Sequence, residues 1–150
     1  MESTRQVHNA VRELLTSQFL AVLATRNGGQ PYTNLVAFVA TDDLKHLLFV
    51  TGRSTRKFAN LMSDPRAAML IDNRTNQVAD IRHASAATAM GKTEEITEMA
   101  DDRLKQLYLA RHPHLEEFVE SPSTALIRLK VRRYYVVSKF QHVRELHITP

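Results

Sequence analysis

Hydroxyl and cationic side chains are concentrated in one short segment of this sequence, between residues 50 and 65. The side chains are those of Thr51, Ser54, Thr55, Arg56 and Lys57. The segment is typical of a strand end, a polar turn and the first turn of a helix. A helix N-terminus has unpaired N–H groups and positive partial charge, so cations are unfavourable there unless an anion lies in front of them. A phosphate group would suit all these donors together, and the segment therefore predicts an anion-binding site.

A purely structural interpretation of the same segment stays open. Ser54 or Thr55 can act as the N-cap of the helix, and Arg and Lys are common on exposed helix faces. The sequence contains no glycine-rich phosphate-binding fingerprint that would decide between the two interpretations.

Length and composition indicate an ordinary globular chain. Residues 1–150 are expected to form a single domain, with 43% hydrophobic and 24% charged residues. No apolar run approaches the roughly 18 residues of a membrane span, and the N-terminal residues lack the apolar core of a signal peptide. The chain has no cysteine, which excludes disulfides, thiolate metal sites and a cysteine nucleophile. A cytoplasmic location without membrane contact is therefore expected.

The net charge of +4 raises the question of a nucleic-acid partner. The densest basic group lies in residues 127–133, where cations alternate mostly with apolar residues. Period-2 alternation places these cations mostly on one solvated face of a strand, so no nucleic-acid partner is expected. A basic nucleic-acid binder remains the weakest alternative, and salt-dependent association would reveal it.

Periodicity and turn signals predict an α+β arrangement that is mainly β. Helices are expected over residues 3–15, 56–63 and about 96–111. Strands are expected over residues 19–25, 32–41, 46–51, 67–72, 84–92 and 125–137, followed by a final short strand or tail over 143–148. Residues 73–83 are expected to form a loop. Asn27-Gly28 between two apolar runs is a strong hairpin signal. Five or six strands in hairpin order with inserted helices favour an antiparallel barrel.

Two further groups of residues receive structural interpretations. His112 and His114 suggest a metal pair, but zinc needs three or four ligands, so a surface loop is expected there instead. Glu94-Glu95 and Asp101-Asp102 are interpreted as solvated charge near the start of the second long helix, signalled by residues 96–108 that include Met99. No metal ligand and no catalytic acid or base is nominated.

The order of elements and three sequence motifs resemble the pyridoxamine 5′-phosphate oxidase-like, FMN-binding split-barrel superfamily. The resemblance rests on residues 29–36, more heavily on the block from Thr51 to Pro65, and on Gly91 after a strand of small residues. It implies a six-stranded antiparallel split β-barrel with flanking helices. It also implies a homodimer in which FMN lies between the subunits, so that part of each site comes from the partner chain.

The resemblance also assigns residues to the cofactor. In that superfamily the strand–turn–helix block holds the FMN phosphate, in agreement with the anion site inferred above. The positions implied for the phosphate are Thr51, Thr55, Arg56 and Lys57. The positions implied for the ribityl chain and flavin ring are Asn34, Leu35, Val36 and Val50.

The sequence departs from the pyridoxamine phosphate oxidases proper at two cofactor positions. Those enzymes have arginine where this chain has Asn34 and glutamine near the place of Ala86, and this chain lacks their C-terminal arginine and histidine pattern. We therefore expect an oxidoreductase of unassigned small-molecule substrate, which uses flavin hydride or electron transfer and needs no essential acid or base side chain.

A cofactor-binding protein without turnover is the alternative from a different class. Residues 72–91 also resemble the haem-utilisation branch of the superfamily, which makes haem a possible ligand, with His83, His142 or His147 as candidate axial ligands. A deazaflavin is a further option, because it too has a phosphate for Lys57 to hold.

Overall fold

The computed structural model describes residues 3–97, 102–139 and 141–150. Its strands are β1 (Leu20–Asn27), β2 (Gln30–Ala40), β3 (His46–Gly52), β4 (Arg66–Asp72), β5 (Ala86–Glu95), β6 (Thr124–Ser138) and β7 (His142–His147). Its helices are α1 (Thr4–Ser17), α2 (Arg56–Ser63), α3 (Asp80–His83), α4 (Asp102–Arg111), α5 (Glu116–Glu120) and the 3₁₀ helix η2 (Pro113–Leu115).

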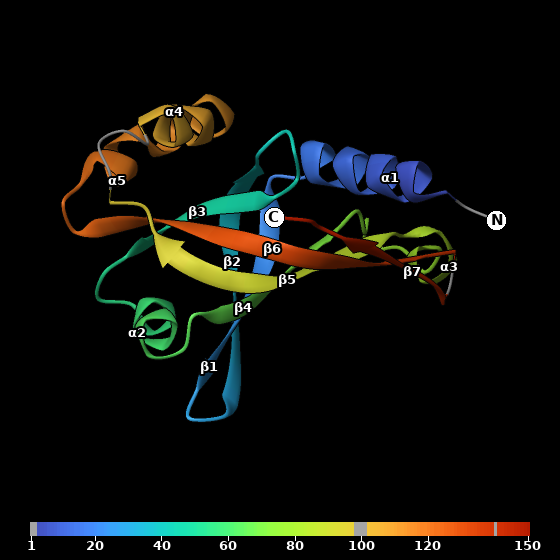
Figure 1. Cartoon of the computed structure of the whole chain (residues 1–150), viewed down its shortest axis with the longest axis horizontal. Coiled ribbons are helices and arrows are strands. Elements are labelled where there is room, and N and C mark those ends of the chain that lie inside the picture. The colour runs from blue at the N-terminus through green and yellow to red at the C-terminus, as the bar shows by residue number, and fades with distance from the viewer. Residues whose placement is uncertain (1–2, 98–101, 140) are drawn as a thin grey trace.

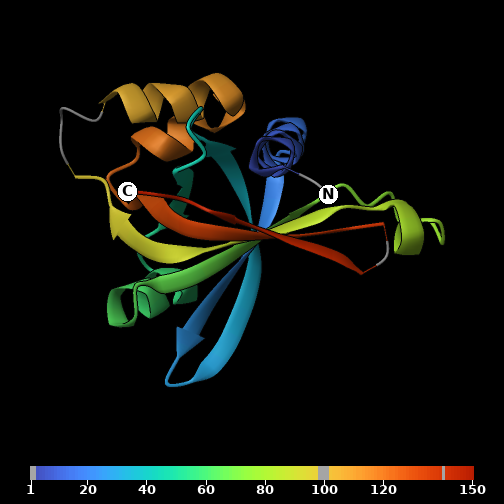
Figure 2. The same cartoon turned by 45° about the vertical axis from the view of Figure 1, so that its right-hand side comes forward.

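The strands form one antiparallel sheet that closes into a barrel (Figures 1 and 2). The strand order is β3-β2-β1-β4-β5-β6-β7, and β3 also pairs with β6. This additional pairing closes six strands, and β7 extends the sheet beyond the barrel along β6. The six-stranded antiparallel barrel expected from the sequence is confirmed.

Strand β6 holds the barrel together because it pairs with three strands. Its first half pairs with β3, its second half pairs with β7, and β5 runs along most of its length. A β-bulge interrupts the β5–β6 pairing: Met90 lies opposite Arg133 and Gly91 lies opposite Val131, so Arg132 has no partner on β5. The bulge changes which residues face the core. Inward residues are odd-numbered up to Val131 and even-numbered from Tyr134 onward.

The main core fills the barrel and extends to two helices. Leu23, Phe38, Phe49 and Met69 are fully buried inside it, and Tyr134 joins them with its hydroxyl donating to the Leu44 carbonyl at 2.7 Å. Helix α1 adds a stripe of apolar residues at helical spacing, namely Val7, Val11, Leu14 and Leu15. Helices α1 and α2 lie on opposite sides of the barrel in Figure 1.

A second core lies outside the barrel and attaches the C-terminal helices. Leu48 and Val50 point outward from β3 and pack with Tyr108 of α4, together with apolar residues of η2 and α5. The Tyr108 hydroxyl donates to the Ala37 carbonyl at 3.0 Å, and burial raises the pKa of Tyr108 to about 12. The face of β3 that this core covers is therefore closed to a ligand.

Three of the predicted element boundaries need correction. Glu94 and Glu95 do not begin a helix; they end strand β5 and form ion pairs with Arg128 and Arg53. The expected loop over 73–83 contains the short helix α3. The expected second long helix starts at residue 102, so Ile96 precedes it. Met99 and Asp101, which the sequence prediction assigns to the start of this helix, lie outside the described residues. No helix in the described part of the chain is long and apolar enough to cross a membrane.

Substitution of Gly91 tests how much the bulge contributes to the stability of the fold. A Cβ atom built on Gly91 would lie 1.9 Å from the Lys130 carbonyl oxygen, which is too close for any side chain without a backbone shift. We expect Gly91→Ala to lower the free energy of unfolding by about 2–3 kcal/mol in urea titrations. Gly52→Ala is the matched control, because its Cβ would meet only the Thr55 methyl group at 3.5 Å. Equal stability of the two variants would contradict this account.

Candidate functional site

The turn between β3 and α2 is organised by two threonine hydroxyls. The Thr51 and Thr55 Oγ1 atoms lie 2.9 Å apart, and the Thr55 hydroxyl donates to the Gly52 carbonyl at 2.9 Å. Thr55 is the N-cap of α2, where its side chain accepts a hydrogen bond from the Phe58 N–H at 3.2 Å. Thr51 is only 1% exposed. Both hydroxyls therefore have partners within the turn, which fixes the position of the helix N-terminus.

Arg56 and Lys57 occupy the first turn of α2 without a neutralising carboxylate. That turn contains no acidic residue, and within the described ranges neither cation forms an ion pair. Arg56 is exposed, and its guanidinium carbon lies 6.0 Å from the centre of the Tyr32 ring. Lys57 is partly buried, and this desolvation lowers its pKa. Two cations beside the free N–H groups of a helix end form a site suited to an anion.

Arg53 comes from the same turn but has a different environment. Its guanidinium donates two hydrogen bonds to the Glu95 carboxylate, at 3.1 and 2.6 Å. Its backbone N–H donates to the Ser123 carbonyl at 2.9 Å. Arg53 therefore fastens the turn to the end of β5, and of the neighbouring cations only Arg56 and Lys57 are left for a ligand.

Helix α2 is anchored to β1 by a buried polar pair. The Asn60 amide donates to the Thr25 hydroxyl at 2.9 Å, and both side chains are almost completely buried. Asn60 therefore serves the packing of α2 on β1. Thr25 lies opposite Tyr32 in the β1–β2 pairing, so the anchor places the start of α2 beside the same hairpin face as Tyr32 and Asn34.

The residues predicted to line the ribityl chain and flavin ring lie in different environments. Asn34 has a buried side-chain oxygen with no hydrogen-bond partner among the described atoms, and Leu35 is 64% exposed. The side chains of Val36 and Val50 are buried, in the barrel core and the outer core respectively. Val36 and Val50 can therefore offer only their backbone to a ligand. The unpaired oxygen of Asn34 is a costly buried acceptor that a ligand hydroxyl would satisfy.

One histidine is buried, His8 and His46 are half-buried, and the other four are exposed. His112 is 1% exposed, its Nε2 lies 2.7 Å from the Phe38 carbonyl oxygen, and burial lowers its pKa. The expected surface loop is therefore wrong for His112, because the residue fastens the end of α4 onto β2. His83, His142 and His147 are exposed. Among the described residues, no group of three or more potential metal ligands is found.

Comparison with known proteins identifies a family and a shared fold. The sequence profile of the family described as pyridoxamine 5′-phosphate oxidase matches residues 7–138. No curated protein matches the sequence significantly.

Solved structures repeat the fold at low sequence identity. A heme binding protein from Mycobacterium smegmatis has a TM-score of 0.84 at 16% identity over 98% of this chain. ChuZ from Campylobacter jejuni has a TM-score of 0.83 at 13% identity over 98% of this chain. The chain spans 59% and 61% of the lengths of these two proteins. A FAD-binding protein from Mesorhizobium loti has a TM-score of 0.67 at 16% identity, over 85% of this chain and 91% of its own.

Proposed function

The chain belongs to the pyridoxamine 5′-phosphate oxidase family, and from that premise we propose that it is an FMN-binding oxidoreductase that acts on a small-molecule substrate. The observation that supports this proposal most directly is the environment of Lys57. A partly desolvated ammonium group stands at a helix N-terminus with no carboxylate within the described chain to pair with it. Such a charge is unfavourable without a bound anion, and the FMN phosphate is the anion proposed here.

The residues of the site fit the parts of FMN. Lys57 and Arg56 would neutralise the phosphate, while the N–H groups of the first turn of α2 would bind its oxygens. Thr51 and Thr55 would hold this turn in place rather than bind the phosphate themselves, since their hydroxyls are bonded to each other. Asn34 would accept a hydrogen bond from the ribityl chain. Bound FMN would supply the hydride or electron transfer, and the protein would bind and orient it.

A homodimer is part of this proposal, because one outer face of the sheet is apolar and uncovered. Outward-facing positions of β1, β2, β6 and β7 carry large apolar side chains, and those of Leu20, Leu35, Val137 and Val143 are between 39% and 64% exposed. In the described structure α4 and α5 pack on the outside of β3, and α1 and α2 pack against the barrel core. This outer face is left open. A second copy of the chain would bury it and bring partner residues to the flavin.

A haem- or deazaflavin-binding protein without turnover is the second candidate. The fold shared with the heme binding protein from Mycobacterium smegmatis favours haem. The candidate axial ligands His83, His142 and His147 are all exposed, so an iron bond to any of them would form at the surface or across a subunit interface. A deazaflavin would use the same phosphate contacts as FMN.

Absorption spectroscopy separates these candidates. We expect the purified protein, after addition of FMN, to retain flavin absorption through gel filtration. We also expect NAD(P)H to bleach this absorption and an added acceptor to restore it. Retained flavin that no donor reduces would support a binding protein without turnover. A sharp haem band retained in place of flavin would contradict FMN as the cofactor.

Replacement of Lys57 tests the phosphate site. Lys57→Ala should weaken FMN binding by about 1.5–3 kcal/mol, the range for hydrogen bonds to charged groups, with unchanged circular dichroism. Flavin fluorescence titration measures this affinity. Arg53→Gln is the matched control from the same turn and should bind FMN almost as well as the parent, because a glutamine amide can still donate to Glu95 and keep the turn attached to β5. Equal weakening by both variants would point to a general charge effect.

A charge on the uncovered face tests the dimer. Leu35→Glu should convert the dimer to a monomer in analytical ultracentrifugation and reduce flavin retention, because a buried unpaired carboxylate opposes association. Phe118→Glu is the control: Phe118 is 43% exposed but lies on α5, away from this face. A monomeric parent protein, or a Leu35→Glu variant that remains dimeric, would refute this interface.

A further inference from the structure

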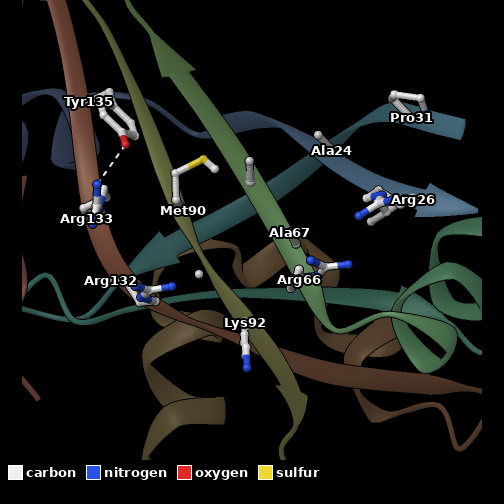
Figure 3. Close-up of a pocket in the computed structure, with 13 residues that line it drawn as sticks. Ala24, Arg26, Pro31, Arg66, Ala67, Met90, Lys92, Arg132, Arg133 and Tyr135 are labelled. Atoms are coloured by element: carbon white, nitrogen blue, oxygen red, sulfur yellow. Dashed lines mark hydrogen bonds between the residues drawn. The ribbon is translucent and has the colours of Figure 1, made fainter. Parts of the chain in front are cut away.

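A cavity of about 390 Å³ opens where the β1–β2 hairpin separates from the rest of the barrel. Strand β1 pairs with β4 only through Val22, Leu23 and Ala24, whereas its pairing with β2 continues to Asn27. Beyond Ala24 the hairpin therefore projects away from β4, as Figure 2 shows. In Figure 3, Ala24, Pro31 and Arg26 of the hairpin lie on one side of the cavity and Met90 and Tyr135 on the other.

The lining combines an apolar surface with an excess of positive charge. Small and apolar side chains of Ala24, Pro31, Ala68 and Met90 contribute to the walls. The cationic side chains that line the cavity are Arg26, Arg66, Lys92, Arg132 and Arg133. This volume lies within the usual range of small-molecule pockets, which are mostly apolar with a few placed polar groups.

Two carboxylates offset only part of this charge. Asp64 lies 2.9 Å from the Arg66 guanidinium and 3.7 Å from that of Arg26, and these contacts lower the pKa of Asp64 to about 2. Glu145 lies 3.9 Å from Arg133. Lys92 and Arg132 have no ion-pair partner anywhere in the described part of the chain. At least two cations at the cavity are therefore available to an anionic ligand.

The β-bulge adds a second outward-facing cation, Arg133, beside Arg132 at this cavity. In a regular strand the residue after inward-facing Val131 points outward and the next one points inward. Because Gly91 lets the Lys130 carbonyl approach closely, the bulge places both Arg132 and Arg133 on the outer side before Tyr134 turns into the core. Bulges commonly redirect side chains next to binding sites.

We propose that this cavity binds a small organic anion, in which a carboxylate, sulfonate or phosphate monoester is attached to an aromatic or aliphatic body. The apolar walls would take the body, and Arg132 with Lys92 would take the charge. The site is separate from the phosphate site at α2. Arg26 and Pro31 are paired on the hairpin face that lines the cavity. Thr25 also borders the cavity, but it is paired with Tyr32 on the opposite face, where its hydroxyl accepts a hydrogen bond from Asn60 of α2.

Two naphthalene dyes that differ in a single charged group test this proposal. Anilinonaphthalene sulfonate carries the anion, and neutral N-phenylnaphthylamine is its uncharged counterpart. Fluorescence titration of the full chain should show tighter binding of the sulfonate. Arg132→Gln should weaken sulfonate binding about tenfold and leave the neutral dye unaffected. Asp64→Asn should strengthen sulfonate binding, because it frees Arg26 and Arg66 from their carboxylate.

Two control variants show whether the change in sulfonate affinity comes from the cavity. Arg103→Gln removes an exposed cation of α4 that does not line the cavity, and should leave sulfonate affinity unchanged. Lys57→Ala should also leave it unchanged, so that failure of the FMN proposal and failure of this one are distinguishable. Equal sulfonate affinity in the parent, Arg132→Gln and Asp64→Asn proteins would overturn the proposal. Loss of sulfonate binding as the chain dimerises would also overturn it, because the occupant would then be a second copy.

Discussion

The structure depends on the absence of a side chain at Gly91, because the Lys130 carbonyl lies against the place that a Cβ atom would occupy. This close packing allows one extra residue in β6, and that residue reverses the side-chain alternation halfway along the longest strand. Before the bulge β6 directs Leu129 and Val131 inward and closes the barrel on β3; after it, Tyr134 and Val136 face inward and β7 is added outside. Without the extra residue, Tyr134 would face solvent and its hydrogen bond to Leu44 would be lost.

The closed barrel in turn determines where the ligand-binding groups lie. The β3–β6 pairing runs to Gly52 and holds the start of the turn that follows. The Asn60–Thr25 bond holds the helix into which this turn leads. Helix α2 is short and would be marginal by itself, and these two attachments fix its N-terminus beside the hairpin. The hairpin then separates two basic regions: Arg56 and Lys57 on one face, and the cavity lined by Arg132 on the other.

The elements with strong local signals were predictable, and those set by distant contacts were not. The helices expected over residues 3–15 and 56–63 and the hairpin at Asn27-Gly28 follow from short-range chemistry, and all were found. The first helix begins with a capping box of Ser3 and Gln6, and the second ends just before Pro65. The extension of β5 to Glu95 depends on pairing with β6, which local sequence does not encode. Helix α3 depends on the Asp80 carboxylate, which accepts hydrogen bonds from the backbone of residues 75–77. Of the candidate site, the cations were predictable, but the internal use of both threonine hydroxyls was not.

Sequence proximity alone could not show which cation of the β3–α2 turn is free. Arg53, Arg56 and Lys57 are close in sequence, but β5 brings Glu95 to Arg53 and no carboxylate to the other two. Lys57 is also desolvated, which disfavours its charged form and lowers its pKa. An anion bound in front of α2 would favour the charged form again, so anion affinity and protonation of Lys57 must strengthen each other. The fold thus places unpaired positive charge at the N-terminus of α2, where a bound phosphate would stabilise it. Arg53 is already neutralised by Glu95 and serves to attach the turn to β5.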